Sequence, residues 1–295
     1  MNKKLLTAYA CAMLTVVLWA MSYIWADQLL DLNIPIEFFV PVRILMAGVL
    51  LWVINRTMHL PLRIRSRKDF LQILLLALCV PFIYFVAETY GLKYTESPTI
   101  TSLIVATNPI FAMVAGMLIF QEKFTRINIL GVFIALAGLW LVTYTRTHTG
   151  PYFLLGIGII FISVIAEVSQ IAFTKSLAQR YHPAVIVMYQ FLLGSIFFAP
   201  LLLTKGLQGF DAGLYLSWKV IYPTLALALL CSATAYTSWA FAIKKLGVAK
   251  TSVFLAVVPL VTAVLALVTG NEVFSALQWV GLAIGMVGIY LTQKA

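Results

Sequence analysis

Two matching stretches decide the fold; they read TSLIVATNPIFAMVAGMLIFQEKFTRINILGVFIALAGLWL at residues 101–141 and TSVFLAVVPLVTAVLALVTGNEVFSALQWVGLAIGMVGIYL at residues 251–291. The register continues without a gap, and it aligns rare residues as well as common ones: Pro109 with Pro259, Glu122 with Glu272, and Gly138 with Gly288. Matches of Leu and Val mean little in an apolar sequence, but the chain has only 10 Asp and Glu residues. The sequence therefore indicates a tandem duplication, with repeats at residues 1–150 and 151–295.

The composition excludes a soluble globular domain. Of the 295 residues, 62% are hydrophobic and 10% are charged, and the mean hydropathy is +1.00, whereas soluble domains are nearer half apolar and a quarter charged. A helix that crosses a bilayer needs about 20 apolar residues. We therefore expect an all-α polytopic membrane protein with ten transmembrane helices. The expected spans are residues 6–28, 36–54, 70–91, 99–120, 127–145, 152–174, 183–203, 219–242, 251–269 and 277–292.

The positive charge of the chain follows the expected topology. The net charge is +10, and most of the 20 Lys and Arg residues fall on the segments that share a side with Lys3 and Lys4. Because cytoplasmic loops carry an excess of Lys and Arg, this pattern predicts an even number of spans with both termini in the cytoplasm. We expect a multi-pass protein of the bacterial inner membrane, and the charge does not indicate a nucleic-acid partner.

The number of spans per repeat determines how the repeats are oriented. Each repeat contains five expected spans, and because five is odd, the second repeat enters the membrane from the opposite side. Inverted repeats of this kind are typical of alternating-access carriers, since two similar halves can exchange conformations around one site at the midplane. Some channels share the architecture, so the step from inverted repeats to a transporter is made by analogy.

Several short motifs carry a family resemblance. They are the run LWAMS from Leu18 to Ser22, Arg43, the run YGLKYTES from Tyr90 to Ser97, Asn108 with Pro109, and Glu122. In these motifs and in its two five-helix repeats, the whole chain resembles the EamA-like branch of the drug/metabolite transporter superfamily. The resemblance implies ten helices around a central cavity and secondary transport, often export, of amino acids or other small metabolites. The second repeat has Ala166 in place of Trp19, so a site built on Trp19 would be asymmetric.

Three charged residues within the expected spans are the strongest site candidates: Arg43, Glu88 and Glu167. A charge at the centre of a bilayer costs about 3 kcal/mol on insertion scales, so each needs a partner, a cavity or a function. Arg43 is interpreted either as a cavity cation for a carboxylate or phosphate, or as a lock on a neighbouring helix. Gln190 takes its place in the second repeat, which slightly favours the lock.

The two carboxylates allow several roles. Glu88 is a candidate to pair with Arg43, to carry a coupling proton, or to accept the ammonium group of a substrate. Glu167 has no basic residue near it along the helix, apart from Lys175 two turns later. Unless Arg43 or Lys175 reaches it, we expect Glu167 to be protonated or to face a cavity.

Aromatic and amide side chains complete the set of substrate-binding or coupling candidates. Trp19 and Tyr23 lie one turn apart, and Tyr236 and Trp239 lie three residues apart. The family resemblance places their helices against the cavity, where the rings would hold an amine or amino acid by cation–π or stacking contacts; packing in the core or in the interface belt is the alternative. The remaining candidates are Tyr84, Asn108 and Gln170.

Proline and glycine residues recur at matching places in the two repeats. Pro109 and Pro259 are expected in the middle of helices, as hinges or as static kinks. Small residues mark one face of the last span of each repeat and predict close helix packing within the monomer, with a dimer interface as the alternative. These residues are Gly131, Ala135 and Gly138 in the first repeat and Gly281, Gly285 and Gly288 in the second.

Enzyme signatures are nearly absent from the sequence. The three His residues are isolated, the three Cys residues lack metal-ligand spacing, and there is no nucleotide-binding loop. We therefore expect no enzyme activity, no cofactor and no metal. The expected partners are a small-molecule substrate, membrane lipid and, as a candidate, protons, for a monomer or a weak dimer. The alternatives are a passive facilitator or channel, and an intramembrane enzyme that would require Glu88 and Glu167 to converge on one cleft.

Overall fold

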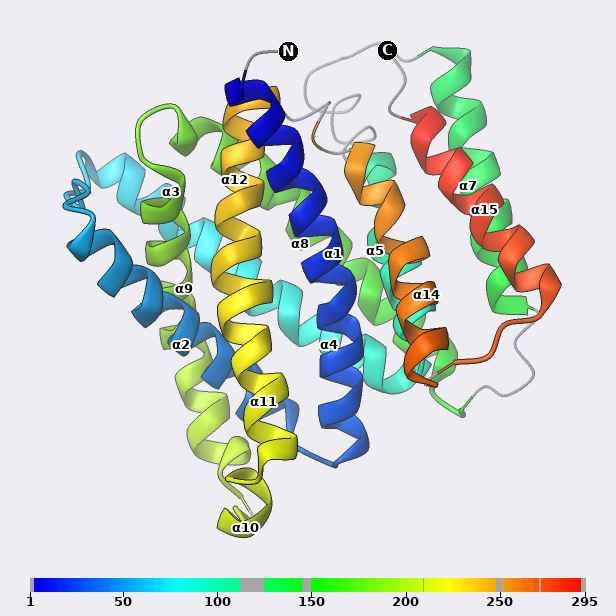
Figure 1. Cartoon of the computed structure of the whole chain (residues 1–295), viewed down its shortest axis with the longest axis horizontal. Helices are drawn as coiled ribbons and strands as arrows, with labels where there is room; N and C mark the ends of the chain where they lie inside the picture. Colours follow the sequence, from blue (N-terminus) through cyan, green and yellow to red (C-terminus); the bar gives the residue numbers. More distant parts are fainter. Residues whose placement is uncertain are drawn as a thin grey trace.

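The computed structural model of the chain is helical throughout the part that it describes, with no strand there. The described residues are 3–111, 125–144, 150–208, 210–247, 251, 253–270 and 272–292. Helix α1 (Lys3–Asp31) begins, and α15 (Ala276–Thr292) ends, at the same end of the bundle (Figure 1). We call this end the terminus face and the other end the opposite face.

Among the residues that the structure describes, seven helical stretches are long and apolar enough to cross a membrane. They are α1, α2 (Ile36–Thr57), α3 through α4 (Arg67–Thr95), α7 (Arg126–Tyr144), α8 (Phe153–Ala178), α9 (Pro183–Leu201) continued by η2 (Leu202–Gly206), and α11 through α12 (Trp218–Leu246). The shorter apolar helices α14 (Val258–Thr269) and α15 match the last two expected spans. Helix α5 (Pro98–Val105) opens the fourth expected span, of which residues 112–120 lie outside the described part, as does Glu122.

The third span of each repeat is broken by a π-helical segment. In the first repeat, η1 (Leu78–Ile83) separates α3 (Arg67–Ala77) from α4 (Tyr84–Thr95). In the second repeat, η3 (Leu227–Thr234) separates α11 (Trp218–Ala226) from α12 (Ala235–Leu246). Such breaks free backbone carbonyls that need other donors. Gln190 Nε2 donates to the Val80 carbonyl in η1 over 2.8 Å, and Thr234 Oγ1 donates to the Leu229 carbonyl in η3 over 2.8 Å.

Both repeated prolines follow a helix break instead of lying in mid-helix as expected. Helix α5 ends before a turn at Ala106 and Thr107, and Pro109 lies in the helical residues 108–111 that follow, where this described part of the chain ends. In the second repeat, the 3₁₀ segment η4 (Val253–Val257) precedes α14, and Pro259 lies in the first turn of α14. Proline is favoured in the first turn because its missing N–H would have no helical partner there.

Helices pair across the two halves of the chain in a reciprocal way. Helix α2 packs on α9, α5 on α14, and α7 on α15, so equivalent spans meet each other. The first span of each half instead packs on the third span of the other half, since α1 packs on α12 and α8 packs on α4. Figure 1 shows the α7–α15 pair at one side of the bundle. The first and third spans therefore form one of the places where the two halves meet.

Glycine residues bring α7 and α15 into backbone contact. A Cβ atom at Gly138 would lie 2.2 Å from the Gly285 nitrogen, and one at Gly288 would lie 2.1 Å from the Ala135 nitrogen. No side chain fits at these distances. The small-residue faces of the two halves are therefore used against each other within one chain.

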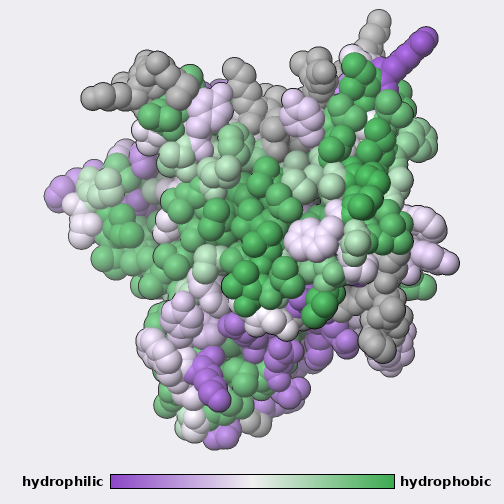
Figure 2. All heavy atoms as spheres, turned by 45° about the vertical axis from the view of Figure 1, so that its right-hand side comes forward, coloured by the Kyte–Doolittle hydropathy of each residue, from purple (hydrophilic) through white to green (hydrophobic). Residues whose placement is uncertain are grey.

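The surface is apolar over a broad band. Figure 2 shows hydrophobic residues across the middle of the molecule. Hydrophilic residues gather at the bottom of the view, which is the end of the bundle called the opposite face. Large apolar side chains are widely exposed along the helices, such as Phe133 at 67%, Leu154 at 79% and Val268 at 77%. An exposed apolar surface of this extent fits contact with lipid tails, and the chain is a multi-pass membrane protein.

Candidate functional site

A cavity lies where the two halves meet, and both halves line it. Its volume is about 20 Å³, which is room for about one water molecule. The first half contributes Trp19, Ser22, Tyr23, Arg43, Tyr84, Phe85, Glu88, Ser102, Val105 and Ala106; the second half contributes Glu167, Tyr236, Leu255 and Val258. Seven of the residues expected at a site on sequence grounds are therefore brought together: Trp19, Tyr23, Arg43, Tyr84, Glu88, Glu167 and Tyr236.

Arg43 is the cation of the cavity, and it is only 3% exposed. Its Nε donates to Ser232 Oγ on η3 over 3.2 Å, and its guanidinium lies 4.2 Å from the centroid of the Phe85 ring. No carboxylate within the described residues lies within ion-pair distance of it. Arg43 thus reaches across to the second half, as a lock would, while it keeps donors toward the cavity for an anionic group.

Two carboxylates converge on the same cavity. Tyr84 donates a hydrogen bond of 2.5 Å to Glu88 Oε1, and Tyr23 also lies beside Glu88. Glu167 comes from α8 of the second half; its Oε2 is buried without a hydrogen-bond partner. Asn108 lies beside Glu167 without a hydrogen bond of ordinary geometry. Glu88 and Glu167 are near enough to repel each other, so the described lining of the site combines one cation with two acidic groups.

Aromatic rings form one wall of the site. The Trp19 ring lies 5.2 Å from the Tyr236 ring and 5.1 Å from the Trp239 ring, measured between centroids. Tyr236 is also in edge contact with Phe85 and Phe191, at 6.1 and 5.3 Å. Trp19 Nε1 is a buried donor with no partner. An aromatic wall with an unused N–H suits an organic molecule that carries both apolar and polar surface.

The remaining candidates lie around the cavity instead of lining it. Trp239 supports Trp19 from behind, and Gln190 is committed to the Val80 carbonyl of η1. Gln170 lies one turn beyond Glu167 on α8, is 6% exposed, and has an unpartnered Oε1. The prolines Pro109 and Pro259 flank helix breaks near the cavity, whose lining includes the neighbouring Ala106 and Val258.

Sequence reasoning did not select several residues that complete the site. The polar ones are Ser22 and Ser102, which line the cavity, and Ser232, which binds Arg43. Isolated serines in apolar spans are a weak signal, because serine often bonds to its own helix backbone. Phe85 contacts both Arg43 and Tyr236; its place three residues before Glu88 was the available signal for it.

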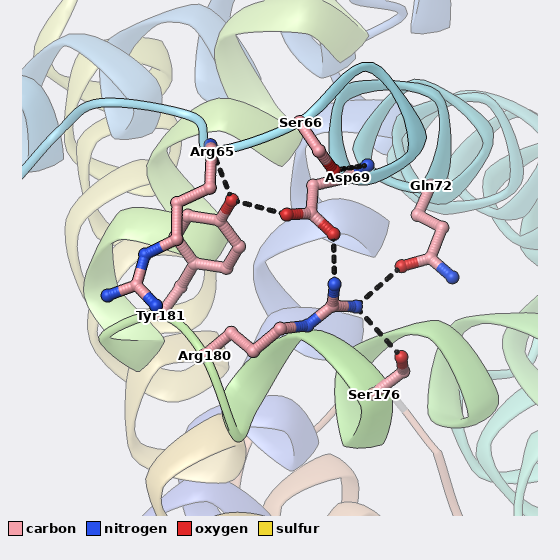
Figure 3. A network of polar contacts seen from close by, with 7 residues as sticks. All are labelled: Arg65, Ser66, Asp69, Gln72, Ser176, Arg180 and Tyr181. Carbon is pink, nitrogen blue, oxygen red and sulfur yellow. Dashed lines mark hydrogen bonds and ion pairs between the residues drawn. The ribbon is translucent and has the colours of Figure 1, made fainter.

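A polar network joins the two halves at the terminus face (Figure 3). Asp69 of α3 forms an ion pair with Arg180, which follows α8, and its Oδ2 accepts a 2.7 Å hydrogen bond from Tyr181. The Tyr181 hydroxyl accepts in turn from the Arg65 backbone N–H over 2.8 Å. Arg180 also donates to Gln72 and Ser176. We call Arg65, Asp69, Arg180 and Tyr181 the terminus-face network.

The Tyr181 hydroxyl keeps its proton in this network. Burial and the Asp69 carboxylate raise the pKa of the Tyr181 hydroxyl above its usual range, outweighing the opposing effect of the Arg65 N–H. The hydroxyl therefore stays protonated near neutral pH and remains the donor to Asp69.

At the opposite face, Tyr90 donates to Glu37 Oε1 over 2.5 Å within the first half, and Ser97 donates to Glu272 of the second half.

Comparisons with known proteins agree with this architecture. The sequence model of the "EamA-like transporter family" matches twice, at residues 6–144 and 154–293. The "Uncharacterized transporter YetK" of Bacillus subtilis (strain 168) is 23% identical over 92% of this chain and 82% of its own length. The "Probable terminal-alkyne amino-acid exporter" of Streptantibioticus cattleyicolor is 29% identical over 72% of this chain and 69% of its own length. A crystal structure of a protein 13% identical in sequence superposes with a TM-score of 0.73, covering 96% of this chain and 95% of that chain, which shows a likeness of fold alone.

Proposed function

The chain belongs to the EamA-like transporter family, and on this premise we propose that it is a secondary transporter that exports a small organic metabolite, with an amino acid as the best candidate. An amine or a drug-like cation is the next candidate. The proposal includes ten transmembrane helices in two inverted five-helix repeats, residues 1–150 and 151–295, that rock around the central cavity.

The observation that carries the proposal is the cavity itself. It combines the Arg43 guanidinium, the carboxyl groups of Glu88 and Glu167, and an aromatic wall that includes Trp19 and Tyr236. A zwitterion with an apolar side chain matches this set, because its carboxylate suits arginine, its ammonium suits a carboxylate, and its side chain suits the rings. The relative named as an amino-acid exporter gives independent support for this class.

Support for inverted repeats comes from the helix pairing. Equivalent spans meet in α2 with α9 and α7 with α15, and the reciprocal pairs α1 with α12 and α8 with α4 enclose the cavity. Two halves related in this way can exchange conformations and expose one site to each side in turn. The matching π-helical breaks in the third spans, η1 and η3, add further support.

The closed cavity fits one step of alternating access. With room for about one water molecule, the cavity must open before it admits an amino acid. The terminus-face network connects α3 of the first half to the loop between α8 and α9 of the second. We assign this network the role of a gate that must separate when the cavity opens toward the terminus face.

The orientation follows from the distribution of charge. Basic residues gather at the terminus face: Arg56, Arg63, Arg65, Arg67, Lys68, Arg126, Arg180, Lys244 and Lys245. Far fewer lie at the ends of helices on the opposite face, among them Lys93, Lys205 and Lys219. By the positive-inside rule we place the terminus face in the cytoplasm of a bacterial cell, with the chain in the inner membrane.

Transport in proteoliposomes tests the proposal. Purified protein is reconstituted, and uptake and counterflow are measured with a panel of labelled amino acids, amines and organic acids. A carrier shows saturable flux that is stimulated by unlabelled substrate on the far side. Flux that rises linearly with concentration and shows no such stimulation would instead indicate the passive facilitator or channel.

The same assay addresses the enzyme alternative, because Glu88 and Glu167 do line one cavity, as that alternative requires. The transported label is recovered and analysed by mass spectrometry, and chemically unchanged substrate supports transport. Proton coupling is tested by repeating the flux at several pH values. A converted product that forms without net flux would contradict the proposed carrier.

A further inference from the structure

Within the described residues, four buried polar side chains near the cavity each have at least one polar atom without a hydrogen-bond partner. Asn108 is 1% exposed, Glu167 8%, Gln170 6% and Thr174 3%. Both amide atoms of Asn108, Glu167 Oε2, Gln170 Oε1 and Thr174 Oγ1 have no partner. Glu167, Gln170 and Thr174 are spaced three and four residues apart, so they lie on one face of α8. We call these three residues of α8, together with Asn108 from the first half, the α8 polar file.

The lack of partners distinguishes the file from other polar residues of the same helix. Ser163 lies on the same face, one turn from Glu167 in the direction of the opposite face, and bonds to the Ile160 carbonyl over 2.7 Å. Ser169 bonds to the Ile165 carbonyl, and Ser176 accepts from Arg180. The unpartnered atoms thus begin at Glu167 and continue only toward the terminus face.

A dry environment does not suit this arrangement. Each buried amide, hydroxyl or carboxyl group that loses its water without gaining a partner costs free energy, and buried polar groups in proteins are normally bonded to protein or to ordered water. Water is the ligand that can satisfy donors and acceptors of all these kinds at once, and clustered polar groups are the places where it is held. The file therefore has the chemistry of a chain of water molecules.

The position of the file gives the water chain a direction. Helix α8 runs from Phe153 near the opposite face to Ala178 at the terminus face (Figure 1). At 1.5 Å per residue, Thr174 lies about 10 Å beyond Glu167 along the helix. Thr174 is one turn from the end of α8, and Ser176, two residues further on, accepts from Arg180 of the terminus-face network. The file thus spans the distance from the cavity to that end of the bundle.

We infer that the α8 polar file is a hydrated path that connects Glu167 to the solution at the terminus face while the cavity is closed. Water and protons pass along it, but the organic substrate does not. The inference rests on the proposed function for its purpose, which is to let Glu167 exchange a proton with one side of the membrane. The path ends at Glu167, because Ser163 beyond it is bonded to its own helix.

Accessibility labelling tests the path without any substrate. Cys11, Cys79 and Cys231 are first replaced by alanine, and single cysteines are introduced as Gln170→Cys, Thr174→Cys and, as the control, Ser163→Cys, which lies on the same face and is 0% exposed. A small cationic methanethiosulfonate is then added to vesicles from either side. We expect the cysteines at 170 and 174 to react from the terminus face at least about tenfold faster than the one at 163, because only hydrated thiols ionise readily.

Each other outcome of the labelling overturns the path. Silence at both 170 and 174 would show that the file is dry, and reaction at 174 alone would show that water stops before Glu167. Equal reaction at 163 would show a general opening of the helix packing. Since no transport is measured, these results are independent of whether the proposed function is correct.

A transport variant gives a second readout. Thr174→Val keeps the shape of the side chain and removes its hydroxyl; the control is Thr262→Val, a buried threonine that bonds to the Val258 carbonyl of its own helix. We expect Thr174→Val to lower the maximal rate about threefold or more with an unchanged KM for the substrate, since the file acts on the proton and not on substrate binding. An unchanged maximal rate and pH profile, with normal flux in the wild type, would overturn the inference and leave the proposed function standing.

Discussion

The third spans of the two halves have a similar backbone course but carry different side chains at the cavity. Each is 29 residues long, Arg67–Thr95 and Trp218–Leu246, and each is interrupted by a π-helical segment. When the spans are aligned at their first residues, Glu88 falls opposite Trp239 and Phe85 opposite Tyr236. The third span of the first half thus carries a carboxylate where the third span of the second half carries an aromatic ring.

This difference shows which features the duplication preserved. Helix breaks and pairing are preserved, as the proposed rocking of two similar halves around one cavity would require. Charge is not preserved, and on the proposed function this fits a single substrate molecule that presents different groups to the two halves. The network at the terminus face follows the same logic, since Asp69 of the first span falls opposite Val220 of the second.

Removal of the charge of Glu88 is expected to have the largest effect, because it removes the main difference between the two third spans. Glu88→Gln makes both third spans neutral at the cavity. We expect transport efficiency for an amino acid to fall by about 10- to 100-fold, because a hydrogen bond to a charged group contributes about 1.5–3 kcal/mol. The pH dependence of flux should also flatten. The measurement is initial flux in proteoliposomes between pH 5.5 and 8.5; wild-type flux with an unchanged pH profile would show that the asymmetry has no role in binding or coupling.

The α7–α15 contact, which the halves share equally, supplies the next largest effect. Gly138→Ala places a Cβ against the backbone of Gly285, and we expect the free energy of unfolding to fall by about 1–3 kcal/mol. Gly158→Ala is the control, because a Cβ there has nothing within 4 Å. Both variants are compared by denaturant titration in detergent. Equal stability of the two would mean that α7 and α15 lie farther apart than described.

Asp69 tests the difference between the two third spans at the terminus face. Asp69→Asn removes the ion pair with Arg180 while an amide oxygen can still accept from Tyr181. We expect the population that is open toward the terminus face to rise about tenfold, as the loss of roughly 1.4 kcal/mol implies. The measurement is the rate at which a thiol reagent added on that side reacts with a cysteine at Ser22 in the cavity.

A change at the opposite face is the matched control for Asp69. Tyr90→Phe removes the hydrogen bond to Glu37 and leaves the terminus-face network intact. It should not increase labelling from the terminus face. A gain of similar size in both variants would mean that loosening either end opens the cavity without direction.

The ring that falls opposite Glu88 gives the smallest effect. Trp239 supports Trp19 from behind, so Trp239→Leu should raise the KM for an amino acid by a few-fold, in line with about 0.5–1.5 kcal/mol for an aromatic pair. Trp140→Leu is the control, since Trp140 lies on α7 and is 60% exposed. An effect of the same size in both would indicate a change in lipid contact and not in the site.

Much of the fold was predictable from the sequence because the repeat is strong. The match between residues 101–141 and 251–291 predicted two equivalent halves, and the sequence model of the family also matches twice. The cost of burying charge identified Arg43, Glu88 and Glu167, which the structure places around one cavity. These predictions depend on composition and spacing, which the sequence states directly.

The partners of these residues could not be predicted, since they depend on helix rotation. In a span that is apolar on every side, periodicity does not tell which face is turned inward. Ser232 as the acceptor for Arg43, and Arg180 as the partner of Asp69, are contacts between residues more than 100 positions apart. The π-helical break at η3 contains no proline, so no residue type marks it.

The small volume of the cavity has a consequence for the cell that contains this protein. A hydrated sodium or potassium ion is larger than the single water molecule for which the closed cavity has room. On the proposed function, copies in the conformation described here would therefore not let hydrated ions pass through this cavity.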